Sequence, residues 1–373
     1  MPTANTYRTI YQQSNLFVYP VGLSGVTATG QSMSSGNSGF TYVGELSRVQ
    51  SVDLSSTINR TDIDVFGRLA RIDSEIISPP TFTMNFSYLL TDGKNEDLLG
   101  FQSKGGGSFV SGIITKQSHS KNYLISYAPP GQDDDGYTPY TSRDVAALGN
   151  GFISNYSINA AVNQPVTASV TVDGLNIASF TGASGNSPAI NPANAQRITT
   201  WQWQLPVGAA QTGAGTISII KPGDITLNIP NNAAFMSIVS GDYGAPIQSF
   251  TLSIPIVREK IQALGSPFGV SEEITFPVNC TLSIQGLQTN LQPASFDTLL
   301  CNDVPYDLNI ILRQPSCNGT GMQAVVLGFN QAYMSSHRIS QSIGGNASLA
   351  LDFSSQLQGP TSVDGITFSG FFS

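Results

Sequence analysis

Charged side chains are scarce in this sequence. Asp, Glu, Lys and Arg make up 11% of its 373 residues, whereas an ordinary soluble domain contains about a quarter. Ser, Thr, Asn, Gln and Gly stand in their place. A polar but nearly uncharged surface is typical of a Ser/Thr-rich all-β protein, and also of a protein that packs against further copies of itself. Composition alone leaves both interpretations open.

Basic residues are few and scattered. The chain has 16 Lys and Arg residues against 24 Asp and Glu residues, which gives a net charge of −8, and it has no basic run. Proteins that bind nucleic acid neutralise phosphates with clustered Lys and Arg. The composition therefore argues against nucleic acid as a bound ligand, although DNA could still pass along such a surface without being held.

Cysteines, long apolar runs and targeting signals are also missing or rare. Cys280, Cys301 and Cys317 form an odd set without C-x-x-C spacing, so we predict small apolar core or loop residues and no disulfide framework or zinc site. No apolar run approaches the roughly 18 residues of a membrane span. The N-terminal MPTANTYRTIYQQ lacks the basic and apolar regions of a signal peptide. We expect a soluble protein made in a cytoplasm, with no membrane partner.

Catalytic and metal-binding motifs are absent as well. His119 and His337 are the only histidines, and the sequence contains no G-x-S-x-G, H-E-x-x-H or P-loop motif. The acidic GQDDDG at 131–136 lacks the alternating ligands and later glutamate of a calcium loop, so we predict an exposed turn there. We expect no enzyme, no cofactor and no metal.

An internal repeat is the main positive signal. Residues 49–90 align with residues 247–288 without a gap, at an offset of 198 residues, and 13 of the 42 positions are identical. Residues 152–175 likewise align with residues 333–356, at an offset of 181. A period of this size indicates a duplicated domain rather than a solenoid of short repeats.

The repeat also suggests domain boundaries. TGASGNSPAINPANAQ at 181–196 has the Gly, Ser, Pro and Asn content of a linker. We therefore predict a first domain at 1–180 that includes an N-terminal arm, and a second domain at 197–373. The first copy carries extra residues at 102–120 that the second copy shortens.

Both copies show the period-2 alternation of half-buried strands. Apolar residues alternate with Ser, Thr, Asn, Gln and Asp in six segments: 51–56, 81–87, 166–172, 249–254, 279–285 and 347–353. The predicted fold class is mainly β, with a β-sandwich or barrel in each copy. Each sheet should have one apolar face and one face of small neutral polar side chains.

Each copy also predicts one short helix and one long loop. The helices are expected at 91–101, with Thr91 or Asp92 as N-cap, and at 291–302. The loop joins the first two strands, at 57–77 and 255–275. It keeps its length in both copies, and a loop of this size inside a compact domain is usually functional. Glu75 and Glu273 are equivalent within it and are expected to share a structural role.

This arrangement resembles the tail tube proteins of tailed bacteriophages. The features that carry the resemblance are two strands joined by a long loop, a short helix, and a closing hairpin that reads SNYSINAAVNQPVTASVTVDGLNI. It covers about 45–180 and, more weakly, 243–356. The second copy departs from the pattern where Gly344 and Gly345 replace Asn163 and Gln164, and where Arg338 lies on the polar face.

The resemblance implies a structural virion protein of the phage tail. Three two-domain chains would form a pseudo-sixfold ring, and stacked rings would enclose a channel for DNA. The tape measure protein and the genomic DNA would pass through it, and tail tip or baseplate and terminator proteins would bind the ends. The expected lumen-facing residues are Ser51, Asp53, Thr83, Asn85, Ser157, Asn159, Thr167, Ser169, Thr171, Ser249, Thr251, Thr281, Ser283, Arg338, Ser340, Ser348 and Asp352.

The long loop is the expected contact between stacked rings. An apolar centre with a charged rim combines burial with a defined register. The residues expected there are Asp62, Asp64, Phe66, Arg68, Leu69, Arg71, Ile261 and Leu264. The alternative is a hairpin that packs on its own domain.

Two other functions stay open at this level. A tail-tip or baseplate hub could use the same duplicated fold, and copy number per particle would separate the two roles. A tandem β-sandwich adhesin or carbohydrate-binding protein would also have a Ser/Thr/Asn surface. Trp201 and Trp203 lie on one strand face in TWQWQLP and could stack on a sugar, but the first copy has no match for them.

Overall fold

The computed structural model is built almost entirely from β-strands. The described residues are 14–21, 40–103, 107–114, 120–129, 134, 143–191, 196–198, 202–205, 220, 225–228, 247–262, 264, 269–287, 305–313, 323–341, 346–357 and 365–370. They form sheets that are antiparallel except for the pairing of β2 (Phe40–Tyr42) with β15 (Gln202–Gln204), and two short helices. The predicted mainly β fold class is confirmed.

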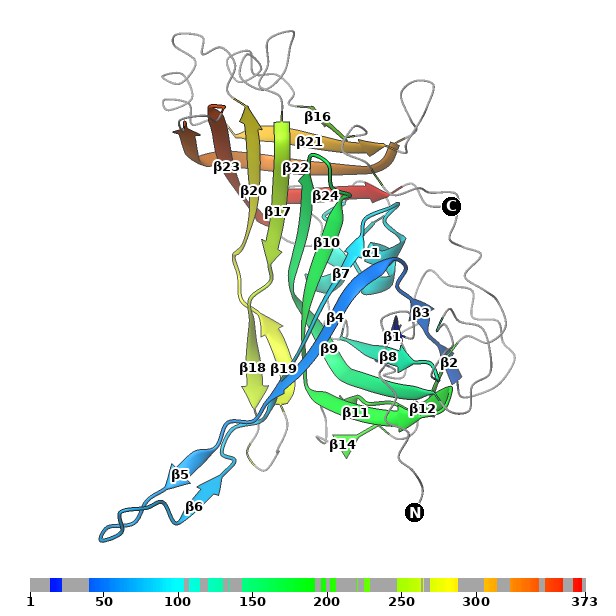
Figure 1. Ribbon diagram of the computed structural model, residues 1–373, viewed down its shortest axis with the longest axis vertical. Helices are drawn as coiled ribbons and strands as arrows, with labels where there is room; N and C mark the ends of the chain where they lie inside the picture. The colour runs from blue at the N-terminus through cyan, green and yellow to red at the C-terminus, as the bar shows by residue number, and fades with distance from the viewer. Residues whose placement is uncertain are drawn as a thin grey trace.

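Eight strands form one continuous antiparallel sheet through the molecule (Figure 1). Four come from each half of the sequence, and all six strands predicted from alternation are among them. In spatial order they are β4 (Val49–Thr57), β7 (Thr81–Leu89), β10 (Thr167–Gly174), β9 (Asp144–Ala161), β17 (Ile247–Pro255), β20 (Val278–Leu287), β23 (Ser348–Leu357) and β22 (Gln323–Ser340). We call this the central sheet.

Two long strands, β9 and β22, connect the central sheet to outer sheets. The first part of β9 pairs with β8 (Lys121–Tyr127) and β11 (Asn176–Thr181), and its second part pairs with β10 and β17. In the same way, β22 pairs first with β21 (Tyr306–Arg313) and β24 (Gly365–Gly370), and then with β23. Each half therefore folds an outer sheet from the strand that ends its share of the central sheet.

The remaining strands extend the outer sheets or form small ribbons. Strand β1 (Ser14–Pro20) pairs with β8 and β3 (Gly44–Glu45), and β16 (Ile225–Asn228) pairs with β21. The ribbons are β5 (Thr61–Ile63) with β6 (Asp73–Glu75), β18 (Arg258–Gln262) with β19 (Gly269–Ile274), β13 (Ile190–Asn191) with β14 (Gln196–Arg197), and β2 (Phe40–Tyr42) and β12 (Ser184–Asn186) on β15 (Gln202–Gln204).

The hydrophobic core lies between the central sheet and the outer sheets. The alternating strands point their apolar residues to this side, and one cluster of buried side chains runs through both halves. Removing this apolar surface from water contributes about 25 cal/mol per Å². Representative members are Met84, Phe86, Tyr156, Val170, Leu252, Leu282, Leu351 and Phe353.

The two halves share β-bulges that could not be predicted from their sequences. A β-bulge interrupts the first strand pair of each half at Gln50 and at Gln248. A second bulge lies at Ser154 in β9 and at Ser335 in β22. Bulges are specific local features rather than defects. Their recurrence at the sequence offsets of 198 and 181 shows that the halves repeat one strand plan.

Backbone conformation repeats too. Asn150 in β9 (φ 50°) and Gln331 in β22 (φ 53°) are both non-glycine residues with positive φ, 181 positions apart. Such residues are uncommon, and both lie where the strand passes from the outer sheet to the central sheet. Pairing in the ribbons also matches, since Thr61 opposes Glu75 and Glu259 opposes Glu273. The domain boundaries themselves stay predictions.

The helices differ in part from the expectation. Helix α1 (Lys94–Leu99) lies inside the predicted 91–101 segment, but its N-cap is Gly93 in a left-handed conformation rather than Thr91 or Asp92. The Asp92 carboxylate still accepts a hydrogen bond from the Lys94 N–H at 3.2 Å. Helix α2 (Ser111–Ile114), in the extra segment of the first copy, was not predicted. The expected helix at 291–302 lies outside the described residues.

Tertiary packing overrides two local expectations. Asp134, in the segment predicted as an exposed turn, is 1% exposed and pairs with buried Arg143 at 3.0 Å. Trp203 is completely buried against Phe180 and first-half strands, and its indole N–H donates to the Asn186 carbonyl. A buried indole offers no face to a sugar ring; Trp201 lies outside the described residues. In the described part of the chain, no helix has the length and apolarity to cross a membrane.

Candidate functional site: a polar sheet face, two edges and two hairpins

The face of the central sheet away from the core is mainly polar. Alternation places the small polar residues of all eight strands on this face, and registers such as Ser51 opposite Ser87 and Ser253 opposite Ser157 align them in rows. None of the residues expected to face a lumen is buried. They lie together on this one face: Ser51, Asp53, Thr83, Asn85, Ser157, Asn159, Thr167, Ser169, Thr171, Ser249, Thr251, Thr281, Ser283, Arg338, Ser340, Ser348 and Asp352.

Polar side chains on this face form hydrogen bonds with one another across strands. The hydroxyls of Ser51 and Ser87 are 2.6 Å apart, and those of Ser340 and Ser348 are 2.7 Å apart. Such cross-strand pairs stabilise a sheet by fractions of a kcal/mol each. Part of the hydrogen-bonding capacity of this face is therefore used between its own strands.

Charge on the polar face is sparse and mostly negative. Its charged strand residues are Asp53, Asp173, Asp352 and Arg338. Asp352 accepts hydrogen bonds from Ser283 Oγ at 2.6 Å and Ser336 Oγ. A surface with one Arg among its strand residues gives phosphate little to bind.

Within the described part of the chain, the central sheet has an open edge on each side. Strand β4 and the second part of β22 each pair with a single neighbour among the described strands. An open edge presents unpaired N–H and C=O groups to solvent. Apolar side chains are also exposed here, with Ile58 at 52%, Tyr333 at 51% and Ile339 at 44%.

The middle of the central sheet shows what covers such an edge. Strand β17 pairs with β9 from Ser249 opposite Ala161 to Pro255 opposite Asn155. We call this pairing the internal junction. The residues of this junction that correspond to edge residues are buried. Leu252, Ile256 and Ile158, the counterparts of Leu54, Ile58 and Ile339, are at most 1% exposed.

An arginine extends the internal junction past the end of β17. Arg258 Nε donates to the Ile153 carbonyl at 3.2 Å, and its guanidinium lies 5.2 Å from the centre of the Phe152 ring. Just before it, the Ile256 N–H donates to the Ser154 carbonyl at 2.8 Å. The root of the second hairpin is thus tied to the first half of the chain.

The first hairpin, β5–β6, projects away from the rest of the molecule (Figure 1). All residues predicted for inter-ring contact are exposed, and Phe66 and Leu69 at its tip are 105% and 110% exposed. Gly67 between them has φ 88°, a conformation that favours glycine. The hairpin therefore does not pack on its own domain. The second hairpin, β18–β19, exposes Ile261 at 43% and Leu264 at 107% in the same way.

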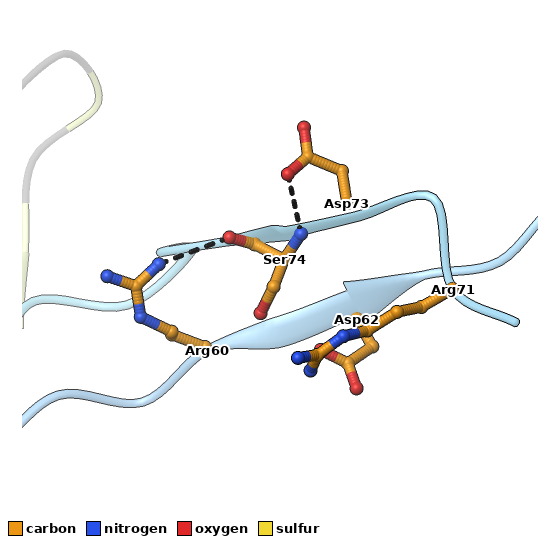
Figure 2. A network of polar contacts seen from close by, with 5 residues as sticks. All are labelled: Arg60, Asp62, Arg71, Asp73 and Ser74. Carbon is orange, nitrogen blue, oxygen red and sulfur yellow. Dashed lines mark hydrogen bonds and ion pairs between the residues drawn. The ribbon is translucent and has the colours of Figure 1, made fainter.

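Polar contacts brace the first hairpin along its length (Figure 2). Arg71 pairs with Asp62 at 2.8 Å, and Arg60 Nη1 donates to the Ser74 carbonyl at 3.2 Å. Hydrogen bonding from Ser74 and Arg71 lowers the pKa of the Asp62 carboxyl. Both partners of the ion pair are about half exposed, so it contributes little stability and mainly fixes the shape of the hairpin.

Two buried carboxyls lie near these surfaces. Glu272 in β19 is 2% exposed and 3.5 Å from Lys260 Nζ. Burial raises its pKa to about 7, against the attraction of Lys260. Behind the central sheet, Glu96 of α1 accepts hydrogen bonds from the hydroxyls of Tyr88 at 2.6 Å and Tyr156 at 3.0 Å. Burial raises the pKa of Glu96 too.

Sequence reasoning identified the polar face and the two long loops, which the structure folds into hairpins, but it missed the junction. Arg60 and Arg258 are identical residues at equivalent positions of the repeated loop, 198 residues apart. Their identity, together with an aromatic residue at both Phe152 and Tyr333, was the available signal for a contact that recurs. For the described residues, no group of three or more His, Cys, Asp and Glu could hold a metal ion.

Comparisons with known proteins do not identify a family for this chain. No protein-family model and no curated protein matches the sequence. Among solved structures, a chain from the tail of an empty GTA particle, computed with helical refinement in C6 symmetry, is 13% identical. The alignment covers 40% of this chain and 98% of that chain, with a TM-score of 0.23. A likeness at this level carries no argument about function.

Proposed function

We propose that this protein is the subunit of a phage-type tail tube. Its copies would close into trimeric rings, and stacked rings would form a channel through which DNA passes during ejection. The protein would act as a structural component of the virion tail, assembled in the host cytoplasm, and not as an enzyme. The observation that carries this proposal is the central sheet, with one polar, nearly uncharged face and two open edges.

Ring closure follows from the edges. An open sheet edge favours pairing with another chain, and a closed barrel removes all edges. The two edges belong to different strands, β4 and β22, so contact between copies is head to tail and closes if the rotation allows it. Three copies of the eight-stranded sheet would give a barrel of 24 strands, wider than the 16–18 strands that already enclose a water-filled channel.

The polar face suits a channel for DNA. Hydroxyl and amide side chains keep the wall hydrated, and the few charges are mainly acidic, so the wall would not bind phosphates and release their counterions. DNA and a tape measure protein could slide past it. The exposed tips of the hairpins would then contact the next ring, with Phe66, Leu69 and Leu264 as apolar anchors.

Native mass spectrometry combined with negative-stain electron microscopy of the purified chain tests the proposal. We expect trimers, and tubes built from them once polymerisation is nucleated. Stable hexamers of the chain, or monomers at every concentration, would contradict the three-copy ring. Single rings that never stack, present once per particle, would favour the hub role instead.

A further inference from the structure

We infer that β4 of one copy pairs antiparallel with the second part of β22 of the next copy, in the register of the internal junction, and that Arg60 locks this contact onto Tyr333 and Met334. This inference deepens the proposed ring, on which it rests. It names the contact surface and its partner, a second copy of this chain. We call it the external junction.

The equivalence of strands fixes which residues meet. Strand β4 corresponds to β17 at an offset of 198, and β22 corresponds to β9 at an offset of 181. The bulges at Gln50 and Gln248, and at Ser154 and Ser335, hold these offsets in the folded chain. In the central sheet, β17 lies beside β9. Strand β4, the counterpart of β17, should therefore lie beside β22, the counterpart of β9, of a neighbouring copy.

The register can be written residue by residue. Thr251 opposes Asn159 and Leu252 opposes Ile158 in the internal junction. Transferring the offsets gives these pairs between copies: Asp53 with Ser340, Leu54 with Ile339, Ser55 with Arg338, Ser56 with His337, and Thr57 with Ser336. Polar residues then meet on the channel face, and Leu54 meets Ile339 on the core face.

Exposure of the edge residues supports this pairing. In the internal junction, Leu252, Ile158 and Ile256 are almost fully buried. Their edge counterparts are not: Leu54 is half-buried, Ile339 is 44% exposed and Ile58 is 52% exposed. The external junction would cover apolar surface that the isolated chain leaves in water, a favourable change of about 25 cal/mol per Å².

The arginine contact transfers in the same way. Arg60 is the counterpart of Arg258, Tyr333 of Phe152, and Met334 of Ile153. Arg258 bonds the Ile153 carbonyl and lies over the Phe152 ring, so Arg60 would bond the Met334 carbonyl and lie over the exposed Tyr333 ring. A guanidinium over an aromatic face is a favourable cation–π pair.

A groove beside β4 is compatible in size with a neighbouring strand. Residues Val49–Val52 and Ile125 line a groove of about 480 Å³. The corresponding residues beside β17, Ile247–Phe250 and Ile310, line a space of about 80 Å³, and Ala160–Val162, at the end of β9, are part of its lining. The end of β22 from the next copy would fill the larger groove.

The external junction also assigns different tasks to the two ends of the first hairpin. Its root, at Arg60, would bind sideways to the neighbour in the same ring. Its tip, at Phe66 and Leu69, would stay free for the next ring. The second hairpin already shows this division: Arg258 at its root binds the first half of the chain, while Leu264 at its tip remains fully exposed.

Disulfide cross-linking tests the register. Cys301 and Cys317 are replaced by Ser. Cys280 can stay, because it is buried and burial raises the pKa of its thiol to about 12, which disfavours thiolate exchange. The test variant carries Asp53→Cys with Ser340→Cys. Directly opposed strand residues are close enough for a disulfide.

Two controls accompany the test variant. Asn159→Cys with Thr251→Cys makes the same pair inside one chain, so it should oxidise within the monomer. Ser55→Cys with Ser340→Cys is two residues out of register on the same face, and should cross-link at least tenfold more slowly. On oxidation of assembled rings, the test variant should give covalent dimers and then trimers on a non-reducing gel, with nothing larger.

The outcomes separate the junction from the ring. If native mass spectrometry shows trimers but the out-of-register pair cross-links as fast as the test pair, the inferred junction is wrong and the ring stands. If the test pair links chains into a ladder beyond trimers, the register stands and the three-copy ring is wrong. If only the intramolecular control oxidises and the chain remains monomeric, both are wrong.

Discussion

Ile58 and Ile256 occupy equivalent positions in the two halves, yet Ile256 is completely buried and Ile58 is 52% exposed. Ile256 follows β17, which has β9 beside it, and its N–H donates to the Ser154 carbonyl at 2.8 Å. Ile58 follows β4, at the open edge of the central sheet. The difference in burial therefore depends on whether four strands from another half of the sheet lie beside the residue, as they do at β17 but not at β4.

The same substitution at these two positions should have opposite consequences. Ile256→Ala removes a buried side chain, so the monomer should lose about 2–5 kcal/mol of unfolding free energy. Ile58→Ala should change monomer stability by no more than about 0.5 kcal/mol, while raising the concentration needed for ring assembly. Urea denaturation of the dilute monomer and native mass spectrometry measure the two effects. A large loss of monomer stability in Ile58→Ala would contradict the edge assignment.

Arg60 should act between copies. We expect Arg60→Ala and Tyr333→Ala each to weaken a ring contact by about 1–2 kcal/mol. Monomer stability should change by no more than about 0.5 kcal/mol, because the bond from Arg60 to the Ser74 carbonyl is exposed. The double variant should lose less than the sum of the two, because both changes remove one contact. Analytical ultracentrifugation gives the ring dissociation constants. Arg258→Ala is the matched control, and should destabilise the monomer instead; full additivity of the Arg60 and Tyr333 effects would exclude their contact.

The central sheet could be predicted because its signal is local and occurs twice. In β7 and β20, for example, apolar and polar residues alternate over the whole strand, and this alternation decides which residues face the core. The polar face follows from the same pattern. Its members could be named without knowing which strands are neighbours, since every strand contributes its outward-facing residues.

The rest depended on contacts between distant segments. Asp134 lies in a sequence typical of an exposed turn, but it is buried in an ion pair with Arg143. Trp203 belongs by sequence to the second copy, yet packs on the first. The pairing of β9 with β17 joins strands about 90 residues apart, and no local propensity encodes such a register. The edges and the junction could therefore be found only once the strand order was known.

Added cations should slow passage of DNA. Ser169, Thr251 and Thr281 are exposed on the polar face, so Ser169→Lys, Thr251→Lys and Thr281→Lys together should permit assembly while binding phosphates. Ejection from particles built with this variant should be slower at low salt and recover as salt rises, since counterion release drives the binding. The triple Gln variant controls for side-chain size. Ejection at the normal rate at low salt in the Lys variant would contradict a lumen position.

Glu272 should make stability depend on pH. Its pKa is raised to about 7 by burial, with Asp173 adding to the rise and Lys260 and Arg258 opposing it. A raised pKa means that the contribution is fully present below the unfolded-state pKa, near 4.5, and is lost as pH rises through about 7. Glu272→Gln should therefore differ little from the natural chain at pH 5 and exceed it at pH 8 by a larger margin, on the order of 1–3 kcal/mol.

Urea denaturation of the dilute monomer between pH 5 and pH 8 measures this difference. Glu259→Gln, an exposed position on the same hairpin, is the control and should leave the pH profile unchanged. If Glu272→Gln lowers stability equally at both pH values, then Glu272 acts as the charged partner of Lys260 rather than as a buried neutral acid.

The tip of the first hairpin should decide whether rings stack. Phe66 is fully exposed in the isolated chain, so Phe66→Ala should leave monomer stability unchanged while removing about 2 kcal/mol or more from each contact that buries the ring. Arg68→Glu should add like-charge repulsion at the rim of the contact. The double variant should still form trimers, because the root of the hairpin is intact, but it should not extend tubes. Electron microscopy of nucleated assemblies measures tube length, and native mass spectrometry confirms the rings. Tubes of normal length from this variant would mean that the tip does not contact the next ring.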